Sequence, residues 1–580
     1  MTFAKFMNPF ATHDVSEFPG VHVPLAGSGR RDPSTAAGPE DNKDDNEKPE
    51  DSRSSDDASS QASQQAGVLT LESLKAEIDA EVAMSGHDTA YDRKSQVINK
   101  AITDIGMGRY QWELFILCGF GWLADNLWLQ GVALTLPQLS AEFGVGGDQV
   151  RYTTLALFTG LCIGASFWGI MSDVVGRRLA FNGTLFLAGV FGLAAGGAPT
   201  WIGACGLYAC VGLGVGGNLP VDGALFLEFI PFASGNLLTL LSVWWPVGNL
   251  IASLIAWPFI TNYSCASDLE SCNATGGQQP CCGKENNWGW RYFILTIGAL
   301  TFAMFICRFF LFHLFESPKF LLSRGRQSEA VAVVYGIAKH NKAKTWLSED
   351  ILNEIGGHPD AVQDDKLSTL EIIKRQLSKF SAQRIGPLFN GWKLGLTTAL
   401  LWFCWTSIGM GYPLFNAFLP QYLGSGDTST YTTYRNYAIT AVVGVPGSVI
   451  ACFTVDIKYV GRKGTMALGT VITGIFLFCF TISSDPDFQL TFSCLEALFQ
   501  NVSYGVLYAY TPEVFPAPNR GTGTGISSFL NRVAGLCAPI VAVNATGSAS
   551  GPIYASGALF FAAFIAMVFL PIETRGKASL

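Results

Sequence analysis

Twelve apolar windows constrain this chain most, because each has about 20 residues and is long enough to cross the hydrocarbon core of a bilayer as an α-helix. Hydrophobic residues make up 49% of the chain and charged residues only 14%, a balance typical of membrane proteins. The sequence therefore predicts an all-α membrane protein. The windows lie at roughly 112–139, 150–171, 179–198, 201–224, 237–261, 289–313, 394–421, 435–455, 465–484, 489–511, 523–545 and 552–571.

A polar, charged stretch at residues 316–393 separates the first six windows from the last six. Two sets of six helices predict two structural halves with a binding site between them. We expect an N-terminal half at 109–315, a cytoplasmic helical linker at 316–393 and a C-terminal half at 394–580. The acidic stretch at 38–67 has few side chains that could form a core, which predicts a disordered cytoplasmic tail over residues 1–108.

The distribution of basic residues predicts how the chain is oriented in the membrane. Lys and Arg gather at Arg93–Arg109, at Arg177 and Arg178, across the linker and at Lys458–Lys463, whereas the alternate loops carry few. The positive-inside rule then places both termini and the linker in the cytoplasm. We expect the plasma membrane as the location, with a vacuolar or other internal membrane as the alternative.

The loop between the fifth and sixth windows falls on the opposite side and has the features of an oxidising, glycosylating compartment. It contains two glycosylation sequons, at Asn262 and Asn273. Asn273 is the preferred glycan site, because Asn262 lies close to a membrane boundary. Four cysteines are candidates for disulfides, and three connectivities are possible for them: Cys265, Cys272, Cys281 and Cys282.

Four motifs lie on the predicted cytoplasmic side, in the order GIMSDVVGRR (169–178), FESPKFLLSRGRQSEA, YTPEVFPAPNRGTGTG (510–525) and PIETRGK (571–577). In these motifs the chain resembles the major facilitator superfamily, and in particular its sugar-porter-type members. GMGRYQW before the first window and GLGVGGNLPVDGALFLEFIP at the fourth look most like the branch related to synaptic vesicle proteins. The resemblance covers about 108–580 and implies two six-helix halves that work by alternating access.

The resemblance also implies a cytoplasmic gate of charged residues. In the wider family a Glu that ends the fourth span and an Arg after the tenth help to lock this gate. We expect ion pairs between the halves, each worth only about 0–1 kcal/mol and therefore reversible. The second copy of the gate loop, VDIKYVGRK, departs from the pattern, because Lys458 stands where an acid is expected. The expected gate residues are Asp173, Arg177, Arg178, Glu228, Glu513 and Arg520.

Three ionisable residues stand out inside apolar windows: Asp125, Asp222 and Arg532. A charged side chain at this depth costs at least about 2.5–3.5 kcal/mol, which makes each one a functional candidate. Arg532 is expected either to neutralise an anionic substrate or to pair with an acid across the cavity. The predicted substrate-binding residues are Asp222, Arg532, Asn416, Asn218 and Trp245.

Asp125 corresponds to the acid of the first span that is the protonation site in several family members. In those members an Arg of the fourth span lies near the acid, but Tyr208 occupies that place here. We therefore expect Asp125 to lack an arginine partner and to favour its protonated form. A structural Asp that is hydrogen-bonded to neighbouring helices is the alternative.

These residues predict a secondary transporter that moves a small polar or charged organic solute, in symport with protons. A non-transporting receptor or vesicle component on the same fold, and a uniporter, are the alternatives. The seventh window lacks the paired Gln of sugar porters, so a hexose is not the obvious cargo. GLGVGG (212–217) lies inside an apolar window and predicts close helix packing rather than a nucleotide site. We expect no enzyme activity, no cofactor, no metal and no nucleic acid, and a monomer in the bilayer.

Overall fold

The computed structural model describes residues 12–25, 70–85, 89–231, 237–266, 269–278, 280–357, 385–424, 428–455, 457, 460–515, 520–544 and 550–574. Within these ranges the chain is helical, and its β-structure is limited to isolated bridges. The all-α architecture predicted from the apolar windows is therefore confirmed.

Each predicted window coincides with one long helix or with two consecutive helices. Nine of the described helices are long and apolar enough to cross a membrane, and α4, α10 and α21 lie at the three remaining windows. The first set is α4 (Arg109–Phe143), α5 (Tyr152–Val175), α6 (Arg177–Ala195), α7 (Trp201–Val215), α8 (Asn218–Phe229), α9 (Leu237–Leu241), α10 (Trp244–Tyr263), α11 (Gly289–Ile306) and η6 (Cys307–Leu311). The second set is α17 (Trp392–Asn416), α18 (Leu419–Leu423), α19 (Thr430–Thr454), α20 (Gly461–Phe480), α21 (Pro486–Val514), α22 (Arg520–Asn544) and α23 (Gly551–Val568).

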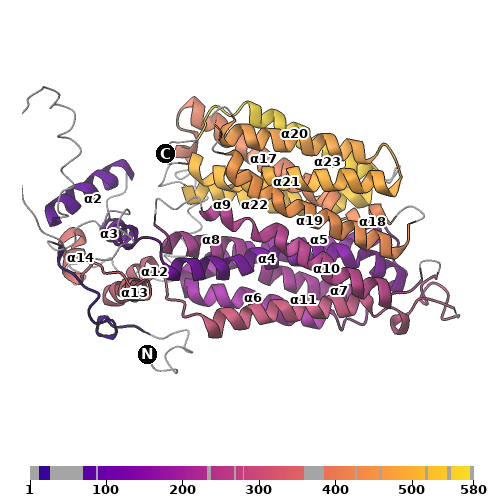
Figure 1. The fold of residues 1–580 in the computed structure, drawn as a ribbon, viewed down its shortest axis with the longest axis horizontal. Helices are drawn as coiled ribbons and strands as arrows, with labels where there is room; N and C mark the ends of the chain where they lie inside the picture. Colours follow the sequence, from indigo (N-terminus) through magenta and orange to yellow (C-terminus); the bar gives the residue numbers. More distant parts are fainter. Residues whose placement is uncertain are drawn as a thin grey trace, which may run out of the picture.

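The two sets form two bundles that lie side by side (Figure 1). The bundles meet where α10 packs on α19 and where α5 packs on α22. Within the first bundle, the backbones of α5 and α7 approach closely. A Cβ atom at Gly212 or at Gly216 would lie 2.3 Å from the carbonyl oxygen of Leu157 or Leu161, respectively. The glycines of GLGVGG therefore serve helix packing, as predicted.

In its described part the linker contributes the three α-helices that lie at one end of the bundles, which we call the linker end. These are α12 (Pro318–Ser323), α13 (Gln327–His340) and α14 (Glu349–Gly356). Residues 358–384 of the predicted linker lie outside the described part of the chain. The loop with the disulfides lies at the opposite end, which we call the loop end (Figure 1).

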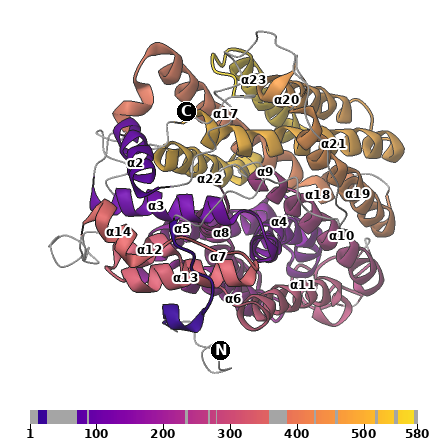
Figure 2. The same cartoon turned by 60° about the vertical axis from the view of Figure 1, so that its left-hand side comes forward.

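The prediction of a disordered tail over residues 1–108 is wrong for two segments that the structure describes as helices. These are α2 (Leu71–Ser85) and α3 (Ala90–Ile105); α3 packs on the linker helices and α2 packs on α3 (Figure 2). The reason is an amphipathic pattern that the composition of the tail hides. On α3, Val97, Ile98, Ala101 and Ile102 form one buried face. The acidic stretch at 38–67 lies outside the described residues.

Residues 12–25 also dock on the linker, where His22 forms a bridge with Thr345. The Nε2 atoms of His13 and His313 lie 3.2 Å apart, and His13 Nδ1 lies 3.1 Å from Glu17 Oε2. His313 follows η6 and lies outside the membrane-spanning helices. Burial, and then the positive charge of Arg178, lower the pKa of His313 from 6.5 to about 3. The docking of residues 12–25 on the linker therefore depends on the neutral form of the His313 imidazole.

We expect acid to release this segment. In the docked state the pKa of His313 lies below its ordinary value of 6.5, so an undocked state in which His313 regains that value binds more protons below pH 6.5, and docking is fully stable above that pH. Between pH 6.5 and about 3 it should lose up to about 1.4 kcal/mol per pH unit. Hydrogen exchange of residues 12–25 as a function of pH measures the effect. The variant His313→Phe should flatten the profile, and an unchanged profile would contradict this role.

Candidate functional site

A buried ion pair joins the two bundles at their centre. Arg532 Nη2 of α22 lies 3.4 Å from Asp125 Oδ1 of α4, and Trp245 Nε1 of α10 donates to Asp125 Oδ2 at 2.9 Å. Asp125 is 1% exposed and Arg532 is 8% exposed. The expectation that Asp125 lacks an arginine partner is therefore wrong. The arginine comes from the other half of the chain, 407 residues away in sequence, rather than from the fourth span.

Aromatic side chains surround this ion pair. The ring of Trp245 lies 5.5 Å from that of Tyr412 and 5.2 Å from that of Tyr504, measured between centroids. A small pocket lies beside them, and its empty space of about 220 Å³ includes space that is open to solvent. In this conformation the site is therefore narrow. The pocket is lined by Trp122, Ser242, Trp245, Ser448, Asn501, Tyr504, Gly505 and Tyr508, which come from both bundles.

A layer of hydrogen bonds next to the pocket also joins the two bundles. Gln130 Nε2 of α4 donates to the Tyr412 hydroxyl at 2.7 Å, and the Tyr437 hydroxyl of α19 donates to Gln130 Oε1. Asn126 Nδ2 donates to the carbonyl oxygen of Trp245 at 2.8 Å. Sequence reasoning missed Asn126 and Gln130. The available signal was that both are amides inside the apolar window that holds Asp125.

A second buried polar cluster lies in the C-terminal bundle. Asn416 Nδ2 of α17 lies 3.2 Å from Gln500 Oε1 and 3.5 Å from Glu496 Oε1, both on α21. Glu496 is 1% exposed. Sequence reasoning selected Asn416 but missed Glu496, although a carboxylate inside the tenth window was visible in the stretch CLEALF. The predicted substrate residue Asn416 is therefore in contact with an acid.

Asp222 and Asn218 lie inside the N-terminal bundle, away from the lining of the pocket. Asp222 Oδ2 accepts from Arg308 Nη2 at 2.7 Å, and both side chains are fully buried. Arg308 also donates to the carbonyl oxygens of Leu117 and Phe181. Asn218 Nδ2 lies 3.4 Å from the carbonyl oxygen of Gly121. This arrangement favours a structural role for Asp222, and its predicted role in substrate binding stays untested.

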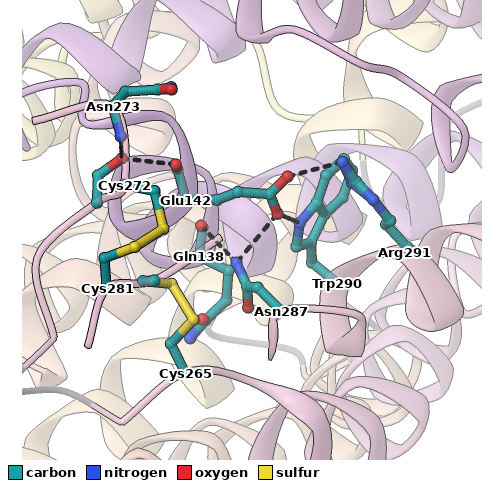
Figure 3. Close-up of a disulfide and its surroundings, with 11 residues drawn as sticks. Gln138, Glu142, Cys265, Cys272, Asn273, Cys281, Asn287, Trp290 and Arg291 are labelled. Atoms are coloured by element: carbon teal, nitrogen blue, oxygen red, sulfur yellow. Dashed lines mark hydrogen bonds and ion pairs between the residues drawn. A yellow bond between two sulfur atoms is a disulfide. The ribbon is translucent and has the colours of Figure 1, made fainter. Parts of the chain in front are cut away.

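Another buried ion pair lies at the loop end (Figure 3). Glu142 accepts from Arg291 Nη2 at 2.7 Å and from Trp290 Nε1 at 2.7 Å. The loop above this pair is held by two disulfides, Cys265–Cys282 and Cys272–Cys281, which is one of the three possible connectivities. Ser271 of this loop donates to the carbonyl oxygen of Glu142 at 2.7 Å. The network therefore ties the disulfide loop to the end of α4.

The charged motifs at the linker end form two equivalent networks, one in each bundle. In the first, Arg177 Nη2 lies 3.4 Å from Glu228, and Glu316 accepts from the backbone N–H groups of Arg177 and Arg178 at 2.8 and 3.3 Å. Burial raises the pKa of Glu316, and the N–H groups that it accepts oppose this shift. The gate was predicted to form ion pairs between the two halves. The described pair of Arg177 and Glu228 lies within one bundle instead.

The second network keeps this arrangement despite the departures at Asp456 and Lys458. Arg462 pairs with Glu513 in the C-terminal bundle. Glu573 accepts from the N–H groups of Arg462 and Lys463 at 3.2 and 3.1 Å. Sequence reasoning missed Glu316 and Glu573, although they are the acids of FESP and PIETRG. The side chains of Asp173 and Arg520, and the whole of Asp456 and Lys458, lie outside the described part.

Comparison with known proteins gives the family. The family described as Sugar (and other) transporter matches residues 129–578. MFS siderochrome iron transporter 1 of Ceriporiopsis subvermispora (strain B) is 43% identical over 501 residues, which are 85% of this chain and 93% of that protein. Synaptic vesicle 2-related protein of Rattus norvegicus is 27% identical over 506 residues, which are 83% of this chain and 82% of that protein.

A solved structure agrees in fold. The partially occluded, inward-open form of the xylose transporter XylE from E. coli has a TM-score of 0.58 and 17% identity, and the match covers 81% of this chain and 99% of that one. The resemblance inferred from the four motifs is thereby confirmed, including the similarity to synaptic-vesicle-related proteins. The siderochrome iron transporter and XylE are transporters, and proteins of this fold and family are not enzymes. The chain therefore belongs to the Sugar (and other) transporter family of the major facilitator superfamily and is a multi-pass membrane transporter of the sugar-porter type.

Proposed function

We propose that this protein is a secondary transporter that moves a small polar or charged organic solute by alternating access, in symport with protons. The observation that carries this proposal is the buried pair of Asp125 and Arg532, whose two members come from opposite bundles beside the pocket. Alternating access requires the two bundles to move against each other around a central site. The distance between Asp125 and Arg532 changes when the bundles move against each other. The ion pair can therefore link this motion to the charge at the site.

Protonation of Asp125 would couple the proton to the solute. A neutral Asp125 leaves the buried guanidinium of Arg532 without its counter-ion, and a buried cation without an anion is unfavourable. An anionic group of the solute would then replace the carboxylate at Arg532. Trp245 and Tyr504 would contact the apolar part of such a solute. The pair therefore favours solutes with an anionic group within the wider class of small polar or charged organic molecules.

Several finer properties belong to the same proposal. We propose that the chain lies in the plasma membrane as a monomer, with the linker end and both termini in the cytoplasm, as the basic residues predict. Asn273 is the proposed glycan site. It is exposed in the disulfide loop, whereas Asn262 lies in the last turn of α10.

The experiment that tests the function starts from purified protein and a panel of sugars, carboxylates, inorganic phosphate and organic cations. A compound that binds only the folded protein raises its stability by about 2.7 kcal/mol at a hundred times its Kd, so a thermal-shift screen selects the probe. The protein is then placed in liposomes that contain a pH indicator. Symport predicts that addition of the selected compound outside acidifies the interior, and that an imposed pH gradient drives its accumulation.

The alternatives give different results in the same assay. A uniporter would move the compound without acidification, which would contradict proton coupling. A receptor or vesicle component would bind the compound without any flux, which would contradict transport. Sugars or organic cations as the stabilising compounds, with carboxylates and phosphate inactive, would contradict the preference for an anionic group.

A further inference from the structure

Glu496 is a buried acid without a cation. Its Oε1 atom lies 3.5 Å from the amide Nδ2 of Asn416, and Oε2 has no hydrogen-bond partner. The side chain is 1% exposed in the middle of α21. Within the described part of the chain, no Lys, Arg or His side chain lies within ion-pair distance of it. A carboxylate in this position would be an uncompensated charge at membrane depth.

Other buried acids of the two bundles each have an arginine partner. Asp125 pairs with Arg532, and Asp222 pairs with Arg308. Glu142 at the loop end pairs with Arg291. In each of these pairs the guanidinium compensates the negative charge that the carboxylate carries when it is ionised. Glu496 differs from them, and its surroundings favour a neutral carboxylic acid.

The surroundings of Glu496 are polar but uncharged. Gln500 lies one turn further along α21, and its Nε2 atom has no hydrogen-bond partner. The titratable groups that face Glu496 from the neighbouring helices are the phenols of Tyr412 on α17 and Tyr437 on α19. Both phenols contact Gln130 of α4, in the layer that joins the two bundles. The phenols of Tyr412 and Tyr437 therefore link Glu496 to the layer that joins the two bundles.

The same face of α21 leads from Glu496 to the pocket. Glu496, Gln500, Tyr504 and Tyr508 follow each other at intervals of four residues, so they share one side of the helix. Asn416 contacts this side at Gln500, and Tyr412 contacts it at Tyr504. The last two members of the series, Tyr504 and Tyr508, line the pocket beside Asp125. Water that enters when the bundles separate would reach Glu496 along this face.

We infer that Glu496 is a second proton-binding site, located in the C-terminal bundle. In the narrow conformation described here, one carboxyl oxygen carries the proton and the group is neutral. When the bundles separate, the O–H bond breaks, the proton passes to water in the pocket, and the carboxylate is stabilised by that water and by the amides of Asn416 and Gln500. This inference deepens the proposed function, because a proton site within the bundle matters only if the bundles move.

Infrared spectroscopy of the protein in lipid tests the protonation directly. The wild-type protein should show the carbonyl band of a protonated carboxylic acid at neutral pH, and Glu496→Gln should lack this component. Asp125→Asn is the matched control. It should keep this component, because the substitution leaves the carboxylic acid of Glu496 in place. A band that persists unchanged in Glu496→Gln would overturn the inference, whether or not the protein transports the probe.

Transport measurements test the role of the proton. Glu496→Gln mimics the neutral acid permanently, so it should exchange the screened compound across the membrane while its pH-driven uptake falls at least about tenfold. Its uptake should also lose the pH dependence that the wild type shows. Uptake by Glu496→Gln with the wild-type rate and pH profile would overturn the coupling role. If the wild type itself transports nothing, the proposed function fails, and the infrared result still decides whether Glu496 carries a proton.

Discussion

Replacing Asp125 with Asn is expected to abolish accumulation of the solute against its gradient while exchange of the solute continues. A pH gradient of one unit supplies about 1.4 kcal/mol per proton, enough for about tenfold accumulation if one proton moves with each solute molecule. In Asp125→Asn this ratio should fall to about one. The asparagine keeps an oxygen for Trp245 Nε1 but cannot gain or lose the proton. The measurement is pH-driven uptake in liposomes, beside counterflow with the solute on both sides.

The matched control for this variant is Asp487→Asn, which removes an exposed acid at the start of α21. It should accumulate the solute like the wild type. Full pH-driven accumulation by Asp125→Asn would exclude Asp125 as the coupling acid and would leave it a structural residue. Loss of both accumulation and counterflow would show that the charge of Asp125 is needed for the site itself rather than for coupling.

Replacing Arg308 with Met is expected to cause the largest loss of stability among single substitutions of the charged residues. Arg308 is fully buried and holds Asp222 through a 2.7 Å contact. Its removal leaves a buried carboxylate without a cation, which costs about 3–5 kcal/mol in proteins. We expect a much lower midpoint of thermal unfolding and a lower yield of folded protein. The measurement is thermal unfolding of the purified protein in detergent.

Two further variants show whether the lost charge is the cause. The double variant Asp222→Asn, Arg308→Met removes both charges and should recover part of the stability. Arg109→Met removes an arginine whose side chain is 78% exposed and pairs with Glu113, so it should change stability by only about 0–1 kcal/mol. A double variant no more stable than Arg308→Met would mean that the loss comes from the packing of Arg308 on Phe181 and from its carbonyl contacts.

The linker-end networks show how far a motif predicts a contact. The motifs located Arg177, Glu228 and Glu513 correctly at one end of the bundles. They did not identify the partners, because the family pattern says which residues recur and not which of them touch in a given conformation. Glu316 and Glu573 accept backbone N–H groups of the two repeated loops, a contact that depends on where each loop lies. The equivalent positions of these acids in the two halves were nevertheless visible in the sequence.

The sequence by itself determined the fold class, the positions of the long helices and the superfamily. These properties follow from the length of apolar windows and from motifs of neighbouring residues, which are local features of the chain. Asp125 also stood out locally, because a carboxylate in an apolar window is costly wherever the window lies.

Only the tertiary structure decided which buried charges are compensated. Asp125 has its arginine 407 residues away, Asp222 has one 86 residues away, and Glu496 has none within the described part of the chain. The cost of a buried charge depends on the atoms around it, and these come from helices that are distant in sequence. The packing of the two bundles therefore distinguishes a paired acid at the centre from an acid that must carry its own proton.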